Sequence, residues 1–336
     1  MADQTLLNQF YDIDNLVSVD IEMSTADWDK VRSTDPHFAW RGNPSWQSPV
    51  TTKDVIDKFN GQCYYYYPTS SVTISGSKYP TKQPPPKFDN VRMVKKSFGG
   101  SNDETKPSIK LDFGRMTKEM KENASDDVKK AAKKSEENAM ALLGTSNCKQ
   151  DDSYVKQPLG YEVVRQGGIP SFRCNFAKVT ITGPALPKGS QPLLKGVFVN
   201  LEPPREALLR NNFNNDKGNL YETEAWFDLT KDSLAKTFDS GGYSSFKNQQ
   251  DMKVAIDQID KSFDATKNVV DMSQVSKVVN VDQVMKVLAS ALIKHHDGHP
   301  NNTFIYNDVV AQEKLTADNG GIKLKLIYIV GYRLDL

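Results

Sequence analysis

Apolar and polar residues alternate with a period of two in several segments of the first half of the chain, which is the pattern of half-buried β-strands. The clearest case is residues 17–23, Val-Ser-Val-Asp-Ile-Glu-Met. Residues 63–74 are rich in Tyr, Val and Thr, which favour a pleated surface. Further strands are predicted over residues 90–94, 108–113, 176–182 and 196–201. This part of the chain is therefore expected to be rich in strands.

The pattern turns helical further along the chain, where apolar residues recur every three or four positions. A helix is predicted from about residue 152 to 166, because Asp152 and Ser153 suit an N-cap and Gly167-Gly168 follow its end. Other helices are predicted over residues 205–211, in pieces between 231 and 265, and over 281–294. Two short strands, 303–306 and 322–330, flank the polar turn 318–321.

Residues 117–143 have a different composition, dominated by Lys, Glu, Ala and Met. Few large apolar residues occur before Met140-Ala141-Leu142-Leu143. This segment is interpreted as a charged helical or partly ordered insertion that faces solvent. A basic recognition helix is disfavoured, because acidic residues are interleaved with the basic ones.

Composition and charge narrow the class of protein. The chain has 336 residues, enough for two domains or one domain with two lobes. Its 43 basic and 42 acidic residues give a net charge of +1, which argues against nucleic-acid binding as the main function. No apolar run approaches the roughly 18 residues of a membrane span, and no secretory signal is visible at the N-terminus. These two features alone suggest a cytoplasmic protein, and the localisation stays open. Cys63, Cys148 and Cys174 are interpreted as unpaired thiols.

Residues 295–302 hold the densest group of side chains with catalytic potential. Three of the four histidines surround Asp297, and Asn302 lies five residues after it. This is the spacing of the kinase catalytic loop, in which the Asp orients the attacking hydroxyl and the Asn reaches a metal on the phosphates. Two other interpretations stay open: a zinc or iron site on the histidines, and a turn whose Asp and Asn bond their own backbone.

The order of predicted elements around this loop is also that of a kinase. Helix 281–294, the loop and a strand pair precede Asp335, in the place of a metal-binding aspartate. Upstream, Lys110 lies on a predicted strand, and a helix, two strands and the extended residues 201–204 follow. Lys110 would hold nucleotide phosphates as a point charge, although an exposed strand lysine is the alternative. The chain has no Gly-x-Gly-x-x-Gly and no Walker motif, so charge would replace a glycine loop.

In this order, several segments resemble the CotH family of spore coat proteins, which are atypical kinases of the secretory type. The resemblance runs from about residue 15 to the end of the chain. It rests on Ile21-Glu22-Met23-Ser24 with Asp27-Trp28, the basic strand pair at 91–113, Gln150-Asp151-Asp152-Ser153, Gly168-Ile169-Pro170-Ser171-Phe172-Arg173, the strand at 196–202, Gly218-Asn219-Leu220-Tyr221, and His296-Asp297-Gly298 with Asn301-Asn302 and Tyr306.

The resemblance implies an α+β, two-lobed protein-kinase-like fold. It places a strand-rich lobe at residues 1–202, with the insertion at 117–143, and a mostly helical, C-terminally shortened lobe at 203–336. It implies ATP and Mg²⁺ or Mn²⁺ as cofactors and protein Ser/Thr as the phosphate acceptor. It makes Asp297 the catalytic acid, Asn302 and Asp335 metal ligands, Lys110 (or else Lys95) the phosphate-binding lysine, and Glu202 the marker of the nucleotide-binding hinge.

Departures from the family pattern keep a second hypothesis open. Arg333 stands where relatives have the first Asp of Trp-Asp-x-Asp, and Gln157 stands where they often have a helical Glu that pairs with the strand lysine. Glu162 is a candidate substitute for that Glu. The alternative is therefore a catalytically impaired kinase-like scaffold that acts as a spore-coat, surface or adhesion protein. A metal hydrolase built on the histidine cluster is a third hypothesis.

Overall fold

The computed structural model describes residues 4–33, 67–89, 91–96, 104–113, 125, 139–143, 155–184, 187, 189–204, 206–216, 218–222, 250–289, 303–307 and 324–328. The chain divides into two compact units. The first comprises Met1–Pro158 and Phe172–Leu208, and the second comprises Leu159–Ser171 and Leu209–Leu336. The expected lobe boundary lay after residue 202; the units divide after residue 208, and residues 159–171 fall in the second unit.

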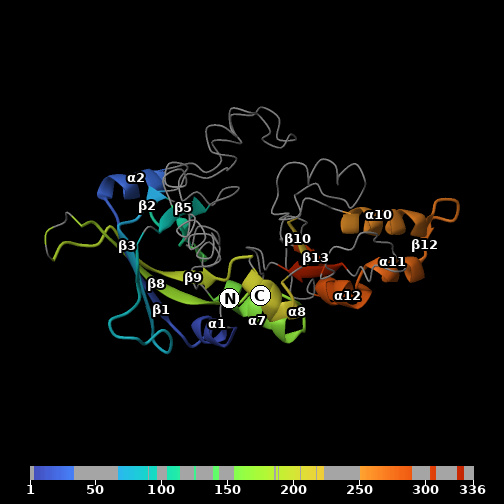
Figure 1. The fold of residues 1–336 in the computed structure, drawn as a ribbon, viewed down its shortest axis with the longest axis horizontal. Helices are drawn as coiled ribbons and strands as arrows, with labels where there is room; N and C mark the ends of the chain where they lie inside the picture. The colour runs from blue at the N-terminus through green and yellow to red at the C-terminus, as the bar shows by residue number, and fades with distance from the viewer. Residues whose placement is uncertain are drawn as a thin grey trace. The chain divides into compact units, whose positions relative to one another are not determined.

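The first unit is built on a nine-stranded sheet with the order β2-β5-β6-β7-β9-β8-β1-β3-β4. Its strands are β1 (Val17–Glu22), β2 (Tyr67–Pro68), β3 (Ser71–Gly76), β4 (Lys87–Phe88), β5 (Arg92–Lys96), β6 (Ser108–Asp112), β7 (Ala139–Leu143), β8 (Cys174–Thr182) and β9 (Leu194–Leu201). Its helices are α1 (Gln4–Phe10) and α2 (Thr25–Ser33) (Figure 1). β1 pairs in parallel with β8 and antiparallel with β3, and the other neighbours in the sheet are antiparallel.

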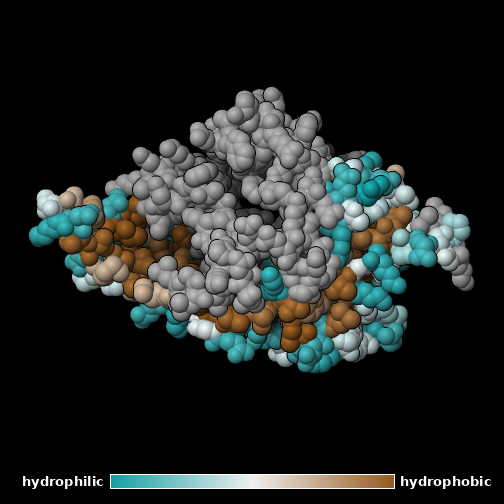
Figure 2. Space-filling view, turned by 180° about the vertical axis from the view of Figure 1, so that it is seen from behind, coloured by the Kyte–Doolittle hydropathy of each residue, from teal (hydrophilic) through white to brown (hydrophobic). Residues whose placement is uncertain are grey.

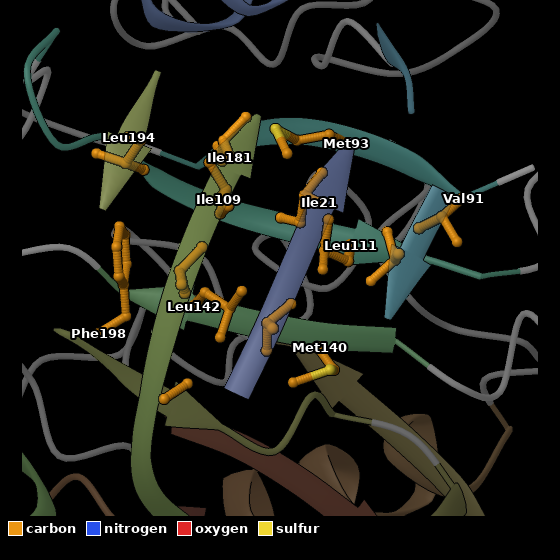
Figure 3. Close-up of a cluster of buried hydrophobic side chains, with 14 of the residues drawn as sticks. Ile21, Val91, Met93, Ile109, Leu111, Met140, Leu142, Ile181, Leu194 and Phe198 are labelled. Atoms are coloured by element: carbon orange, nitrogen blue, oxygen red, sulfur yellow. The ribbon is translucent and has the colours of Figure 1, made fainter. Parts of the chain in front are cut away.

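One face of this sheet carries the hydrophobic core. The alternation along β1 puts Val17, Val19 and Ile21 on this face, and each is at most 1% exposed. The register places Val19 beside Val179 of β8 and Ile74 of β3, so neighbouring strands contribute to the same layer. Figure 3 shows side chains of β1, β5, β6, β7, β8 and β9 directed toward one another across this layer. Period-two burial is thus what gives the sheet two chemically different faces.

Helix α2 covers part of the core face and begins with a side-chain cap. Trp28 and Val31 of this helix are buried in the core cluster. The Ser24 hydroxyl oxygen accepts a hydrogen bond from the Asp27 backbone N–H at 3.0 Å and donates one to the Asp27 carboxylate at 2.8 Å. The second of these bonds is the main reason that the pKa of Asp27 is lowered. A serine followed three residues later by an acid is a helix-start signal.

Two buried asparagines, Asn175 and Asn200, lie next to the core at one end of the sheet. The Asn200 side chain donates to Asn175 Oδ1 at 2.8 Å. Asn175 Nδ2 in turn lies within 2.8–3.1 Å of the carbonyl oxygens of Phe10, Asp12 and Asn15. Because these carbonyls belong to the turn between α1 and β1, the asparagines attach the N-terminal segment to the sheet.

Strand β7 differs from the expectation for the insertion at 117–143. Residues 139–143 form a strand between β6 and β9, with Leu142 opposite both Ile109 and Asn200. The helical prediction was wrong for these residues, because Ala, Met and Leu have high helix propensity but pairing on both sides overrides it. Apart from Ser125, residues 117–138 lie outside the described part of the chain.

The second unit combines a small sheet with helices. The sheet has the order β10-β13-β14, formed by β10 (Asn219–Glu222), β13 (Thr303–Asn307) and β14 (Lys325–Tyr328). The helices are α10 (Gln250–Ser262), α11 (Met272–Val278) and α12 (Val281–Ala289), and a two-stranded ribbon joins β11 (Phe263–Asp264) to β12 (Val269–Val270). Its core contains Tyr221, Met252, Ala255, Ile256, Val278, Ile305 and Leu324.

Two further helices, α7 (Lys156–Gln166) and α8 (Glu206–Phe213), each contribute residues to both units. Pro158 is tolerated in α7 because it lies in the first turn. The helix ends at Gln166, and Gly168, two residues later, has a left-handed φ of +73°, while the Ile169 N–H bonds to the Val164 carbonyl at 3.1 Å. This is the Schellman geometry that a glycine after the helix predicts.

Several predicted elements are confirmed within the described residues. The strands expected at 17–23, 108–113, 176–182 and 196–201 correspond to β1, β6, β8 and β9, and the helix ending at 166 corresponds to α7. Helices α1 and α2 were missed, because the first half was interpreted as strand-rich. Asp27 and Trp28, which were grouped with the opening strand, belong to α2.

Large apolar side chains also reach the surface, which Figure 2 shows as brown areas beside teal hydrophilic ones. In the second unit they include Phe263, Val269, Val270 and Met272, each about half exposed. Scattered exposed apolar residues are usual on soluble proteins. Among the helices that the structure describes, none is long and apolar enough to cross a membrane.

Replacing Asn175 with Ala is expected to lower the free energy of unfolding by about 2–3 kcal/mol, because it removes the acceptor of the buried Asn200 side chain and the hydrogen bonds to the N-terminal segment. Urea denaturation followed by circular dichroism measures the change. Lys178→Ala, at an exposed position of the same strand, is the control, with an expected change within about 0.5 kcal/mol. Equal effects in the two variants would show that the asparagine does not hold the N-terminal segment.

Candidate active site

Lys110 lies in the middle of β6, on the face of the sheet opposite to the core. Its neighbours Ile109 and Leu111 point into the core, so alternation directs Lys110 the other way. Across the sheet it pairs with Val94 of β5 and Ala141 of β7. The side chain is 13% exposed, and its Nζ lies 3.8 Å from Oδ2 of Asp112, which is 1% exposed. The lysine is thus a largely buried cation rather than a solvated one.

Lys95, the other candidate for phosphate binding, is on the core side of the sheet. The register places it opposite Ile109. Its Nζ donates to the carbonyl oxygen of Arg32 in the last turn of α2, at 2.5 Å. A cation at a helix C-terminus is stabilised by the partial negative charge there. The two candidate lysines therefore lie on opposite faces of one sheet, and the ammonium group of Lys95 binds the end of α2.

Glu202 follows β9 and forms a buried ion pair with Arg173, which precedes β8. Nε of Arg173 donates to Glu202 Oε2 at 3.0 Å, and one terminal nitrogen of the guanidinium donates to Oε1. The Arg173 backbone N–H also donates to Oε2 at 3.2 Å, and the Glu202 N–H donates to the Arg173 carbonyl at 3.0 Å. Both side chains are at most 3% exposed. The carboxylate of Glu202 is therefore held inside the first unit.

Helix α1 satisfies the remaining donor group of Arg173. The other terminal nitrogen of Arg173 donates to Asn8 Oδ1 at 2.7 Å and to Gln4 Oε1 at 3.2 Å. The guanidinium carbon also lies 5.6 Å from the centre of the Tyr11 ring. Burial, followed by the charge of Glu202, raises the pKa of Tyr11. The N-terminal segment thus completes the environment of the ion pair.

The strand that follows the candidate catalytic loop is β13, and its end belongs to a buried polar network. Asp251, in the first turn of α10, accepts hydrogen bonds from the Tyr221 hydroxyl at 2.6 Å and from the Asn307 side chain at 3.0 Å. The Asn219 side chain donates to the Tyr221 oxygen at 3.0 Å. Burial, and then the charge of Asp251, raises the pKa of Tyr221.

Tyr306, one residue earlier on β13, anchors the strand to the segment after α8. Its hydroxyl donates to the Asn215 carbonyl at 2.9 Å, and the Gly218 N–H donates to the same hydroxyl at 3.3 Å. Its ring stacks on Phe213 with 4.7 Å between the ring centres. These contacts and the polar network fix β13 at two successive residues.

Helix α7 presents a neutral side chain at the position where the resemblance leads us to expect an acid. Gln157 is buried. Glu162, the candidate substitute, is half exposed and accepts hydrogen bonds from Arg165 at 3.0 Å and from Gln166 at 2.8 Å. The carboxylate of Glu162 thus bonds to side chains of its own helix.

The residues proposed for the chemical step lie outside the described part of the chain. These are Asp297, Asn302 and Asp335, together with the histidines at 295–299 and Arg333. Within the described residues there is no group of three His, Cys, Asp or Glu side chains that could hold a metal ion.

A comparison with protein families matches residues 98–317 to the CotH family, described as CotH kinase protein. The matched segment covers more than half of the chain. The chain belongs to the CotH family. A comparison with curated proteins finds no match.

The CotH match supports the resemblance and bears on the candidate residues. It includes Lys110, Glu202, Asp297 and Asn302, whereas Lys95 and Asp335 lie beyond its ends. A family of kinase proteins indicates a dependence on nucleotide and metal in general terms. The mixed α+β composition of the structure agrees with the expected fold class.

Sequence reasoning missed two of the charged residues that surround the candidate positions. Asp112 was included only in the segment that resembles the basic strand pair and was given no role, although its place two residues after Lys110 on a predicted strand indicates a shared face. Nothing in the sequence indicated that Asp251 belongs to a buried polar network, because its partners Tyr221 and Asn307 are distant in sequence. Arg173 was named only as part of the family resemblance, without a partner.

Replacing Arg173 with Met is expected to lower the free energy of unfolding by about 3–5 kcal/mol, because a buried carboxylate loses its counter-ion. Guanidinium denaturation of the wild type and the variant measures this change in the free energy of unfolding. The control is Arg165→Met, which breaks the half-exposed pair with Glu162 and should cost no more than about 1 kcal/mol. A cost for Arg173→Met as small as that of the control would contradict the assignment of Arg173 as the principal support of Glu202.

The raised pKa of Tyr221 predicts a loss of stability at high pH. The phenol ionises near pH 10 in the unfolded chain but not in the folded one, so its contribution is complete below that pH and is lost as the pH rises above it. The wild type should lose up to about 1.4 kcal/mol per pH unit relative to Tyr221→Phe above pH 10. Urea denaturation of both proteins from pH 8 to pH 11 tests this, and parallel curves would contradict it.

Proposed function

We propose that this CotH family member is a protein kinase that transfers the terminal phosphoryl group of ATP to Ser or Thr of a protein substrate, with Mg²⁺ or Mn²⁺. The family match over residues 98–317 carries this proposal, because it spans both Lys110 and the His-Asp-Gly-His-Pro-Asn-Asn loop. The near-neutral charge of the chain is compatible with a protein substrate rather than a nucleic acid.

Lys110 is proposed to hold the phosphates. Its ammonium group lies in a largely buried position, where low local dielectric strengthens an electrostatic contact. Lys95 is the weaker candidate, because its ammonium group already binds the carbonyl at the end of α2. A single cation acting as a point charge is compatible with the absence of a glycine-rich phosphate loop from the sequence.

Asp297 is proposed to accept the proton of the attacking hydroxyl, as the loop spacing implies. Asn302 and Asp335 are proposed to bind the metal, since carboxylate and amide oxygens suit Mg²⁺ or Mn²⁺. When bound, ATP supplies the phosphoryl group and the metal neutralises charge on it.

Residues 201–204 are proposed as the hinge that contacts the adenine through backbone groups, with Glu202 as its marker. The Arg173–Glu202 pair supports this role by fixing the start of the segment. The two compact units are proposed to be the lobes of a kinase-like fold. A nine-stranded sheet suits a strand-rich N-terminal lobe, and α10, α11 and α12 suit a mainly helical second lobe.

A second candidate function is a kinase-like scaffold without catalysis, which acts as a spore-coat, surface or adhesion protein. It is favoured by the neutral Gln157 in α7 and by Arg333 in place of an expected aspartate. A cation beside a metal site would oppose metal binding by Coulomb repulsion.

Asp297→Asn is expected to lower phosphate transfer at least about a hundredfold while ATP binding persists, because general-base catalysis contributes about that much or more. Transfer of label from γ-labelled ATP to the protein or to added protein substrate, with Mg²⁺ or Mn²⁺, measures the rate. Asp282→Asn, which removes an exposed acid of α12, is the matched control and should retain wild-type transfer.

The outcomes separate the two functions. Label on the wild type and on Asp282→Asn alone supports the kinase with Asp297 as its acid. Label on Asp297→Asn at the wild-type rate would remove Asp297 from that role. If folded wild-type protein binds neither MgATP nor MnATP and transfers no label, the result contradicts the kinase and supports the scaffold function.

A further inference from the structure

Asp112 is a buried acid to which the proposed phosphoryl transfer assigns no role. It lies two residues after Lys110 on β6, and side chains two apart on a strand share one face of the sheet. Its Oδ2 is 3.8 Å from Nζ of Lys110. The register also places Asp112 opposite Arg92 of β5 and Ala139 of β7, so it lies within three paired strands rather than at an edge.

Burial makes the partner of this carboxylate important. Asp112 is 1% exposed, and a charged carboxylate that is removed from water needs a compensating cation or hydrogen bonds. Within the described part of the chain, Oδ1 of Asp112 has no hydrogen-bond partner. The ion pair that the structure gives for the other oxygen is with Lys110. The attraction between these two groups is therefore a main electrostatic contact of the carboxylate.

Helix α7 offers no equivalent acid to Lys110 among its described side chains. Gln157 is neutral, and Glu162 is the acid of this helix. Both carboxylate oxygens of Glu162 already accept hydrogen bonds, from Arg165 and from Gln166. In the proposed kinase, the phosphate-binding lysine thus has the carboxylate of Asp112 beside it, on the same strand.

We propose that Asp112 is a positioning residue that directs the ammonium group of Lys110 toward the nucleotide phosphates. This inference rests on the proposed function of Lys110. The carboxylate attracts the ammonium at close range, which restricts a long and flexible side chain to fewer conformations before nucleotide binds. At 3.8 Å the pair is an ion pair that is longer than a hydrogen bond.

The first test separates phosphate binding from general folding. Isothermal titration calorimetry of the full chain with MgATP and with adenosine gives two affinities for each variant. Asp112→Asn should weaken MgATP binding about tenfold or more, since bonds to charged groups are worth that much, and should change adenosine binding by less than about twofold. A merely structural role would weaken both ligands alike. Asp20→Asn, at an exposed position on the same face of the sheet, should change neither affinity.

Repeating the MgATP titration in the Lys110→Met variant tests whether Asp112 acts through the lysine. In Lys110→Met, the further change Asp112→Asn should weaken MgATP binding by less than about twofold, because no ammonium remains to be positioned. A full additional loss in that background, or unchanged MgATP affinity in Asp112→Asn alone, would overturn the proposal. If the wild type binds no MgATP, the proposed function fails and the positioning role falls with it.

A stability cycle tests the pair itself without nucleotide. Lys110→Met alone leaves a buried carboxylate without its cation and should lower the melting temperature, whereas the double variant Lys110→Met, Asp112→Asn should recover at least half of that loss. If Asp112→Asn alone does not fold, a folded double variant supports the pairing. A double variant that is as unstable as the sum of its single changes would show that the two charges do not interact.

Discussion

The first unit depends on the buried ion pair between Arg173 and Glu202. Two charges removed from water destabilise a protein unless their hydrogen-bonding groups are satisfied, and here the partners come from three places in the chain. The carboxylate bonds to the side chain and the backbone N–H of Arg173, while Asn8 and Gln4 take the donor that the carboxylate does not use. The positions of α1, the start of β8 and the end of β9 are therefore linked by one requirement.

The asparagines of the sheet extend the same constraint toward the core. Asn175 lies two residues after Arg173 and Asn200 two residues before Glu202, so all four side chains share one face of paired strands. The face begins with a charged pair, continues with amides and ends in the apolar core that contains Phe198 and Ala177. The side chains at the polar end form hydrogen bonds with α1 and with the turn that follows it. Apolar side chains at this end of the strands could not form these bonds.

The alternation of apolar and polar residues that forms this core could be predicted from the sequence. Which candidate site residues lie on which face of the sheet could not. The strand at 17–23 and the strand at 108–113 follow from period two alone. Sequence could not separate Lys95 from Lys110, because only the pairing of β5 with β6 shows that they point to opposite faces. Strand β7 was hidden by helix-forming residues, and its place between β6 and β9 depends on contacts far apart in sequence. Asp297, Asn302 and Asp335 stay predictions from spacing and family resemblance.

The position of Asp112 has a consequence for control of the proposed reaction. A lysine that depends on an acid from a helix is correctly placed only when that helix is, so movement of the helix can switch the lysine off. Lys110 and Asp112 lie on one strand, and β6 is paired on both sides. The sheet therefore holds the backbone of both residues, whereas on α7 Gln157 is neutral and Glu162 bonds to its own helix. In such a kinase the lysine would be in place at all times, and regulation would have to act on another step, such as closure over the nucleotide or access of the protein substrate.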